Sequence, residues 1–346
     1  MSHHIEEEID LTLLQLVAPQ PIVDSLVNRL NYGLPFTYLG ETSLIVVNPN
    51  QDLGLFTQEL SNFYVQNGYK ALESSPHRLQ PHIYEIITKA YFVMRRLGTD
   101  QSIIFSGAPN SGKSVSYRES LRQLGQLSLN PKKPSKIPEQ LDHILDIVQS
   151  FTHCSTSSNS TSSRLGLYQE CQFTNRGRLA GIKTIPYYFD KFRLTSIPQN
   201  ESNFHILYHL VEVATPEERS AYGLNTNFNY LPTSIYYKQN NYLNIQESLK
   251  QVNFKAKSRA KINQILAAIL HLGNLEFVSA GDGQEIYISN VNTLDLIADL
   301  LGLDSNELFN ILTSKTQLIG KDLCTTLLDV QGASYERHSI ATTLYS

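Results

Sequence analysis

Along the first hundred residues, the apolar side chains recur at the spacing of a strand in some segments and at the spacing of a helix in others. Residues 36–39 and 43–47 are rich in aromatic and β-branched side chains and flank a turn signal, which predicts two strands. Asn48-Pro49 ends the second strand, because proline cannot donate to a ladder. From Pro81 to Leu97 the apolar residues recur at helical spacing, with a proline at the start and Gly98 behind the last turn. We therefore predict a capped helix there.

The apolar pattern continues as an alternation of strands and helices. Residues 102–105 form an apolar run that predicts a buried strand, and residues 115–127 predict a helix soon after it. The fold class is therefore α/β. No internal repeat is found. The other predicted elements are a helix near 139–150, a β-hairpin of 168–173 and 179–185 around Asn175-Arg176-Gly177, and helices at 204–213, 216–222, 260–272, 295–301 and 305–312.

The composition is that of an ordinary globular protein. The 346 residues exceed one average domain, so one large domain or two closely associated domains are expected. A net charge of −4 gives no electrostatic reason to expect a nucleic acid or an anionic membrane as partner. The three cysteines lack metal-ligand or disulfide spacing and fit a reducing compartment. No apolar run approaches the ~18 residues of a spanning helix, and we expect a cytoplasmic protein.

The segment between the predicted strand and helix carries the most specific chemistry. It fits G-x-x-x-x-G-K-[ST] at every fixed position. Glycines let the backbone N–H groups face the phosphates, the lysine reaches the β/γ oxygens, and the hydroxyl ligates Mg²⁺ at a helix N-terminus. A structural glycine turn is the alternative interpretation. The predicted nucleotide-binding residues here are Gly107, Ala108, Pro109, Asn110, Ser111, Gly112, Lys113 and Ser114.

Other candidates have less chemical support. His205, His209 and His271 lie on apolar helical segments, and we expect structural histidines rather than ligands or bases. The first two have i,i+4 spacing, but the glutamate of H-E-x-x-H is missing after the first. The lysines within residues 132–136 are expected on a solvated loop, with contact to an acidic partner as the alternative.

The tract Cys154 to Ser163 is almost entirely composed of residues with hydroxyl side chains. On composition alone it reads as a solvated linker. It also follows a P-loop and precedes Arg164-Leu165-Gly166, which fits a loop that senses the γ-phosphate. Short hydroxyl side chains suit that role, because they ligate Mg²⁺ or orient water without a stored charge.

Several blocks, in one order, resemble the N-terminal half of a myosin motor domain. Within that family the chain looks most similar to the myosin-like domains fused to fungal chitin synthases. The family blocks are Pro81 to Tyr84, Ala90-Tyr91, Asp100 to Gly107, Ser162 to Gly166, Asn203 to Tyr208, His271 to Leu275 and Leu300 to Asp304. The blocks similar to the chitin synthase fusions are Phe105 to Pro109, Asn175 to Leu179, Gly181 to Thr184 and Tyr187-Tyr188.

The resemblance implies specific roles for the P-loop and for switch I. Ser114 and Ser163 would ligate Mg²⁺, and Ser162 would lie near the attacking water. Asn159 would donate to phosphate oxygens, while Arg164 would form the ion pair that closes the phosphate pocket. Ser162, Ser163 and Arg164 are therefore the catalytic candidates, and Mg²⁺ with ATP is the expected ligand.

The chain also departs from the family pattern. Pro109 removes one backbone donor from the phosphate cradle, and Asn110 replaces a glycine, although asparagine tolerates positive φ. One lost amide–phosphate hydrogen bond costs about 1.5–3 kcal/mol, which is tenfold or more in affinity. Thr161 stands where switch I carries a second asparagine, and Leu165 and Leu167 stand where phenylalanine and lysine are usual.

The sequence gives less support for the adenine-binding part of the expected site. Asn48-Pro49 resembles the start of the family's purine-binding loop, and a plain Asn-Pro turn is the equal alternative. Residues 50–56 lack the usual basic side chains and place Phe56 near the expected tyrosine. Base identity is therefore poorly specified by the sequence.

The resemblance predicts a P-loop NTPase core of myosin-motor type, with a mixed central sheet flanked by helices and a largely helical upper subdomain. We expect residues 1–150 to form the P-loop-containing N-terminal part, and 151–346 to hold switch I, the hairpin and the helical subdomain. No Asp…Gly-Phe-Glu signature of switch II occurs, so we expect a motor domain truncated before that second γ-phosphate sensor, as a fragment or a natural relic.

Two function classes stay open. The first is part of an ATP-hydrolysing actin motor or a myosin–chitin synthase fusion, and the second is a degenerate motor-like tether that does not hydrolyse ATP. An unrelated P-loop kinase or GTPase would need a Walker-B-like strand or an N-K-x-D signature, and neither is evident. We expect no competent hydrolysis by this chain alone, actin as a partner only of a full-length protein, and a cytoplasmic, cytoskeleton-associated location, membrane-attached only in a fusion.

Overall fold

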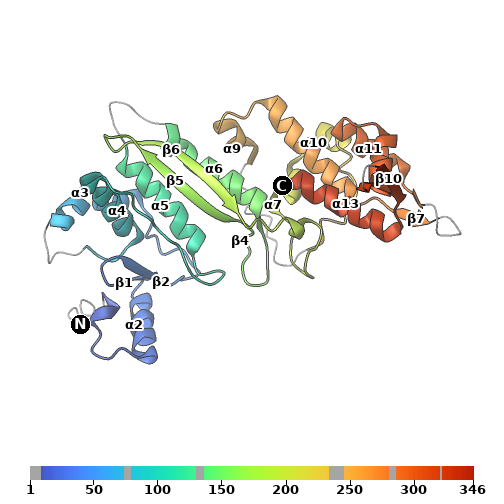
Figure 1. The fold of residues 1–346 in the computed structure, drawn as a ribbon. Helices are drawn as coiled ribbons and strands as arrows, with labels where there is room; N and C mark the ends of the chain where they lie inside the picture. The colour runs from blue at the N-terminus through green and yellow to red at the C-terminus, as the bar shows by residue number, and fades with distance from the viewer. Residues whose placement is uncertain (1–8, 74–78, 130–135, 234–244, 280–285, 320–321) are drawn as a thin grey trace. The chain divides into compact units, whose positions relative to one another are not determined.

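The fold was analysed in a computed structural model, which describes residues 9–73, 79–129, 136–233, 245–279, 286–319 and 322–346 (Figure 1). The chain divides into two compact units. The first contains residues 1–145 and 169–185, and the second contains residues 146–168 and 186–346. The expected boundary at 150/151 stays a prediction.

The first unit is built from helices and one short hairpin before the P-loop. Strands β1 and β2 pair antiparallel, and helix α4 begins at an N-cap histidine, His82, whose Nδ1 accepts from the Tyr84 N–H. Gly98 ends α4 with φ of 66°, as the sequence predicts. The elements are η1 (Leu11–Leu13), α2 (Pro19–Asn31), β1 (Phe36–Leu39), β2 (Ser43–Val46), α3 (Gln58–Glu73), α4 (Ile83–Leu97) and α5 (Lys113–Leu127).

Three further elements contain residues of both units: helix α6 (Lys136–Thr152) and the paired strands β5 (Gly166–Phe173) and β6 (Leu179–Tyr187). The predicted hairpin is thereby confirmed. Its turn needs Gly177, where φ is 75° and a Cβ would lie 2.6 Å from the Tyr91 hydroxyl. That hydroxyl donates to the Gly177 carbonyl at 2.7 Å, so the hairpin turn is fixed to α4.

The prediction of a buried strand at 102–105 is wrong. These residues pair with no strand in the described part of the chain, and Ile104 is 86% exposed. Its neighbours Ile103 and Phe105 still pack against the core, so the backbone is held by side chains rather than by a hydrogen-bonded ladder. The described strands occur only as five separate two-stranded sheets, so the expected central sheet is not assembled from them.

The core of the first unit is formed by residues of α3, α4, α5 and α6 together with Phe36 of β1. Ile87 is fully buried within this core, and Tyr64 stacks on the His82 ring at a centroid distance of 5.4 Å. Phe36 contacts the same ring at 4.5 Å. Burial of these rings removes apolar surface from water and so helps to stabilise the unit that carries the P-loop.

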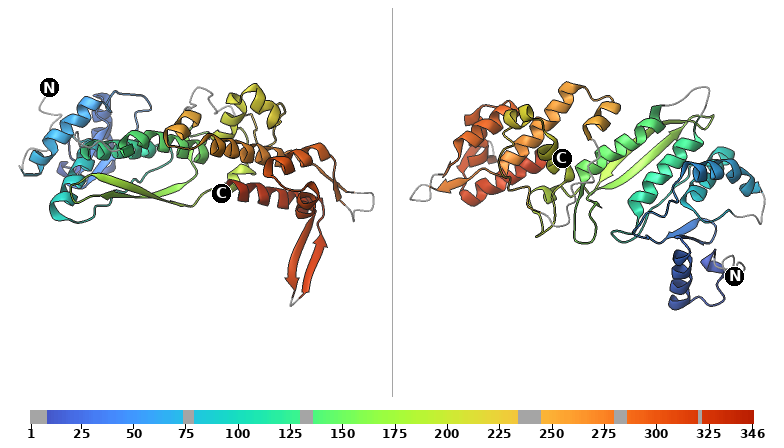
Figure 2. Two further views of the ribbon diagram at one scale, coloured as in Figure 1. Left: turned by 90° about the horizontal axis from the view of Figure 1, so that it is seen from above. Right: turned by 180° about the vertical axis from the view of Figure 1, so that it is seen from behind.

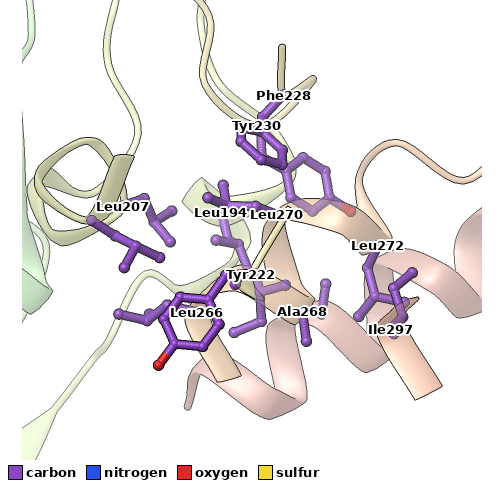
Figure 3. Packing of buried hydrophobic residues seen from close by; sticks show 14 of the residues in the cluster. Leu194, Leu207, Tyr222, Phe228, Tyr230, Leu266, Ala268, Leu270, Leu272 and Ile297 are labelled. Atoms are coloured by element: carbon purple, nitrogen blue, oxygen red, sulfur yellow. The ribbon is translucent and has the colours of Figure 1, made fainter. Parts of the chain in front are cut away.

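The second unit is mostly helical and has its own core around helix α10 (Figure 3). Its long C-terminal helix α13 lies beside α10 (Figure 1), and Tyr345 near its end stacks on Phe204 at 4.8 Å. The helices predicted in this half are confirmed. They are α7 (His205–Val213), α8 (Pro216–Ala221), α10 (Ala256–Leu272), α11 (Val291–Leu301) and α12 (Ser305–Thr313), joined by α9 (Ile245–Gln251) and α13 (Val330–Tyr345).

The second unit also contains short strands. Strands β3 (His153–Cys154) and β4 (Ser162–Ser163) pair with each other, as do β7 (Phe277–Ser279) and β8 (Ile286–Ile288). Strands β9 (Ser314–Ile319) and β10 (Asp322–Leu327) form a hairpin that projects from the helices of this unit (Figure 2). A 3₁₀ turn, η2 (Lys191–Leu194), precedes α7.

Candidate functional site

The P-loop turns on three residues with positive φ. Gly107 has φ of 150°, Asn110 of 61° and Gly112 of 89°. A Cβ at Gly107 would lie 2.7 Å from the Ser111 hydroxyl, which would have to turn away. Gly112 is the N-cap of α5. The loop therefore delivers the chain onto a helix N-terminus, where the first N–H groups have no acceptor inside the helix.

The lysine of the motif lies across its own loop. Lys113 Nζ donates to the carbonyls of Gly107 and Ala108, both at 2.6 Å. Pro109 and Asn110 are exposed, and Ser114 lies exposed on the first turn of α5. The structure thus groups the cation, the hydroxyl and the free helix N–H groups at one end of α5, which is the chemistry that phosphates require.

The Asn48-Pro49 segment lies directly against this loop. Asn48 Nδ2 donates to the Asn110 carbonyl at 2.7 Å, and its Oδ1 accepts from the Asn50 N–H at 3.0 Å. The second bond is an Asx-turn, so the plain Asn-Pro turn weighed from sequence is present. The sequence did not reveal this contact between the two loops.

The predicted switch I segment belongs to the second unit. Cys154 of β3 pairs with Ser162 of β4, and between them the tract forms an ordered turn rather than a solvated linker. Asn159 Oδ1 accepts from the Thr161 N–H at 2.9 Å, and the Asn159 carbonyl accepts from the Thr156 N–H at 2.9 Å. Ser163 is exposed, and its hydroxyl donates to the Leu165 carbonyl at 3.0 Å.

Arg164 has neutral partners. Its Nε donates to Cys154 Sγ at 3.1 Å, and its Nη2 donates to the Ser162 hydroxyl at 3.2 Å. Cys154 is fully buried, and that burial raises the pKa of its thiol, although the neighbouring arginine opposes the shift. Among the described residues no carboxylate forms an ion pair with Arg164. The guanidinium is therefore held by a thiol and a hydroxyl.

The structure contains a buried group of charged and polar residues that supports switch I and that the sequence did not reveal. Arg193 is 4% exposed and forms an ion pair with Glu201 at 2.7 Å. The Arg193 guanidinium also donates to the Ser202 carbonyl, and the Ser202 hydroxyl accepts from the Ser155 N–H at 2.7 Å. Glu201 accepts from the Ser157 N–H at 3.4 Å. We name Arg193, Glu201 and Ser202 the switch platform.

No sequence signal marks this platform, because its members belong to no recognised motif and meet only in three dimensions. Asn203, next to it, begins one of the sequence blocks that resemble the family. The structure makes it a fully buried hub, donating to the carbonyls of Leu194 and Tyr230 at 2.8 Å each.

His209 and His271 are buried and His205 is half-buried, as expected of structural histidines. Burial lowers the pKa of His205 and of His209 to about 4. It also lowers the pKa of His271, whose Nε2 lies 2.9 Å from the Tyr222 carbonyl. His205 Nε2 lies 3.2 Å from the Ser155 hydroxyl and so contacts the start of switch I. Among the described residues no cluster of histidine, cysteine or carboxylate side chains has the geometry of a metal site.

A pocket of about 310 Å³ lies in the first unit between α3, α5 and α6. Its charged lining residues are already paired. Arg122 Nε bonds Asp142 at 2.8 Å, and the Tyr84 hydroxyl donates to Glu119 at 2.7 Å. This pocket offers no unpaired charge to a ligand. Of the predicted lysines, Lys136 is exposed, and the rest of the basic loop at 130–135 lies outside the described residues.

The predicted site residues are therefore distributed over two units, with the P-loop and Asn48-Pro49 in the first and residues 159–164 in the second. Each group is ordered on its own. A model of the myosin head (motor domain) family matches residues 8–346, a range that includes both groups of residues. The chain belongs to the myosin head family, and its α/β fold class is confirmed.

Individual relatives refine this assignment. Chitin synthase 8 of Mycosarcoma maydis is 37% identical over 99% of the chain, and chitin synthase 5 of Cryptococcus neoformans var. grubii is 41% identical over 77% of it. Myosin-1 of Coprinopsis cinerea is 30% identical over 88%. The resemblance to both groups is confirmed. The chain spans 18%, 14% and 24% of these relatives, respectively. In the described part of the chain, no helix has the length and apolar character to cross a bilayer.

Proposed function

We propose that this chain binds Mg·ATP through its P-loop and does not hydrolyse it unaided. Residues 107–114 would cradle the phosphates, with Lys113 as the cation. The observation that carries the proposal is the backbone of the loop, where Gly107, Asn110 and Gly112 take positive φ and lead into α5. A helix N-terminus approached in this way presents N–H groups and a positive dipole end to an anion.

The hydroxyls on the proposed metal side suit Mg²⁺. Ser114 and Ser163 are both exposed, and a serine hydroxyl is the hard oxygen donor that this ion accepts alongside phosphate oxygens and water. In keeping with the family resemblance, Ser162 would lie near the attacking water, and Asn159 would donate to phosphate oxygens. When bound, Mg²⁺ would neutralise phosphate charge, while the protein residues hold the phosphates in place.

Two features argue against turnover by this chain. Arg164 is bonded to Cys154 and Ser162, and no described carboxylate gives it the ion pair that the family uses to close the phosphate pocket. Pro109 supplies no backbone donor to the cradle. Both features support the proposal of binding without competent hydrolysis.

The wider biology is proposed from the relatives' names. Because the chain covers less than a quarter of the length of each relative quoted, an actin-based motor or a myosin–chitin synthase fusion would be a property of a longer protein. Such a protein would be cytoskeleton-associated, and attached to a membrane if it carries a chitin synthase.

Calorimetric titration with Mg·ATP tests the proposal. Wild type should bind saturably, and Lys113→Ala should bind at least tenfold more weakly, because a charged partner of the phosphates is lost. Lys183→Ala is the matched control, since this exposed lysine of the same unit lies on β6. Absence of saturable binding in wild type would refute nucleotide binding. Equal binding by wild type and Lys113→Ala would refute the P-loop assignment.

The alternative function is a non-hydrolysing interaction module. One observation favours it: the hairpin β9–β10 is exposed, with Leu318 69%, Leu323 75% and Leu327 65% accessible. An isolated two-stranded hairpin is marginal in water, and exposed leucines on it suit a protein partner. ATP turnover that rises on addition of filamentous actin would refute this alternative.

A further inference from the structure

Both side-chain amide hydrogens of Asn48 are used in hydrogen bonds within the protein. Nδ2 donates to the Asn110 carbonyl at 2.7 Å and to Asn50 Oδ1 at 3.2 Å, which uses both of its hydrogens. The orientation of the amide follows from chemistry, because a carbonyl oxygen can only accept. Asn48 Oδ1 accepts from the Asn50 N–H. Asn48 therefore has no donor left for a purine base.

Asn50 and Asn110 complete a small network with Asn48, which we name the asparagine bridge. Both take positive φ, 53° and 61°, a conformation that asparagine tolerates better than most residues. Asn50 Oδ1 also accepts from Asn110 Nδ2 at 3.4 Å. The bridge thus ties the 48–50 turn to the middle of the P-loop.

The P-loop has few other anchors. The segment before it pairs with no described strand, and residues 106–110 are exposed. Besides the bridge, the loop is held by its own Lys113 and by the Ser111 N–H, which donates to the Ala108 carbonyl at 3.3 Å. The Cβ of Asn48 would also touch a Cβ at Gly112, 3.8 Å away, so the 48–50 turn backs the last residue before α5. Loss of the bridge would loosen the phosphate-binding backbone itself.

Phe56, which stands near the second position expected to contact the base, packs against other aromatic side chains of the protein. Its ring packs edge-on against Tyr84 at 5.9 Å and Phe36 at 6.2 Å, and lies 5.6 Å from the His82 ring. It has no polar atom to offer a base. In the turn between Asn50 and Phe56, Asp52 is used locally, accepting from the Gly54 N–H at 2.8 Å.

We propose that Asn48 is a positioning residue that braces the P-loop through the asparagine bridge, and that the site selects its ligand by the Mg-bound triphosphate with little regard to the base. The inference rests on the nucleotide binding proposed above. A site that hydrogen-bonds a ligand group rejects analogues lacking it by large factors. Here the residues expected to read the base are occupied within the protein, so discrimination among bases is expected to stay within about tenfold.

Calorimetry with three ligands tests base selection. Wild type should bind Mg·ATP, Mg·GTP and Mg·tripolyphosphate with dissociation constants within about tenfold of one another. Asn48→Ala should weaken all three by the same factor, about three- to tenfold, because about one to two net hydrogen bonds are lost from the loop. A preference for Mg·ATP above tenfold in wild type would overturn the inference, as would a loss in Asn48→Ala confined to Mg·ATP.

Hydrogen exchange in the ligand-free chain tests the bridge independently. Asn48→Ala should speed amide exchange across residues 107–112 at least about threefold, since opening of the loop becomes less costly. Asn67→Ala is the matched control, because this half-buried asparagine of α3 also donates its amide to a backbone carbonyl, that of Phe63. Unchanged exchange in Asn48→Ala would refute the bridge. If none of the three ligands binds, base selection falls with the proposed function, while the exchange result still decides the bridge.

Discussion

The loop at 107–112 is largely exposed and held by hydrogen bonds from its own lysine and from one neighbouring turn. The loop at 155–161, in contrast, begins with buried residues and rests on the switch platform, where Arg193 is 4% exposed and paired with Glu201. The first loop is shaped by the φ angles of its own residues. The second is shaped by residues some forty positions further along the chain.

This difference locates the residues that control each loop. In the P-loop, a substitution inside the motif changes the backbone directly. In switch I, the strongest effects are expected from substitutions outside it, because a buried ion pair with one member removed leaves an uncompensated charge.

The largest effect is expected at Arg193. Arg193→Met should lower the free energy of unfolding of the second unit by about 3–5 kcal/mol, because Glu201 loses its partner in a buried site. Urea unfolding measures it, with exposed Lys257→Met on α10 as the control, expected within about 0.5 kcal/mol of wild type. A loss below about 1 kcal/mol would show that the platform does not hold this unit together.

The second effect depends on pH. The pKa of His209 is lowered from 6.5 to about 4 by burial, so its contribution to stability is complete above pH 6.5 and is lost as pH falls toward 4. At pH 5 this one group should remove about 2 kcal/mol. Urea unfolding of wild type and His209→Gln between pH 7 and 5 measures the change, and the variant should have a slope shallower by about one proton. Equal slopes would contradict the prediction.

A smaller effect is expected in the P-loop. Gly112→Ala should destabilise the first unit by about 1–2 kcal/mol through the strain of φ at 89° alone, since its Cβ would make only ordinary contacts. Gly181→Ala on β6 is the control, because φ there is not positive. Thermal unfolding compares the two. A neutral Gly112→Ala would mean that the backbone of the motif is not fixed in this conformation.

An effect of similar size is expected at Cys154. Cys154→Ala should cost about 1–2 kcal/mol, because it removes an acceptor from the Arg164 guanidinium in a buried site. Cys154→Ser should recover part of that loss, since a hydroxyl can accept the same bond. Denaturant unfolding of both variants provides the measurement. Identical losses would show that the cost arises from the changed side-chain volume and not from the lost hydrogen bond to Arg164.

Much of the architecture could be predicted from the sequence. The helices at 83–97, 113–127 and 256–272 follow from apolar spacing and caps, and the P-loop follows from its glycines and lysine. Residues 102–105 were mistaken for a strand because an apolar run reports burial and extension, whereas a strand also needs a hydrogen-bonding neighbour that no local pattern can supply. The serine tract stayed ambiguous for a similar reason, since composition cannot tell a linker from a loop fixed by distant partners.

By itself, the sequence determined the family, the helices and the phosphate-binding motif, because each is written in local spacing or in backbone conformations that few residues adopt. Only the tertiary structure decided what braces the two loops: Asn48 against the Asn110 carbonyl, Cys154 against Arg164, and Arg193 with Glu201 beneath Ser155. Those contacts join residues that are eight to about sixty positions apart, and no motif contains both partners of any of them. Their partners are chosen by folding, since a buried polar group must find a partner wherever the packed chain places one.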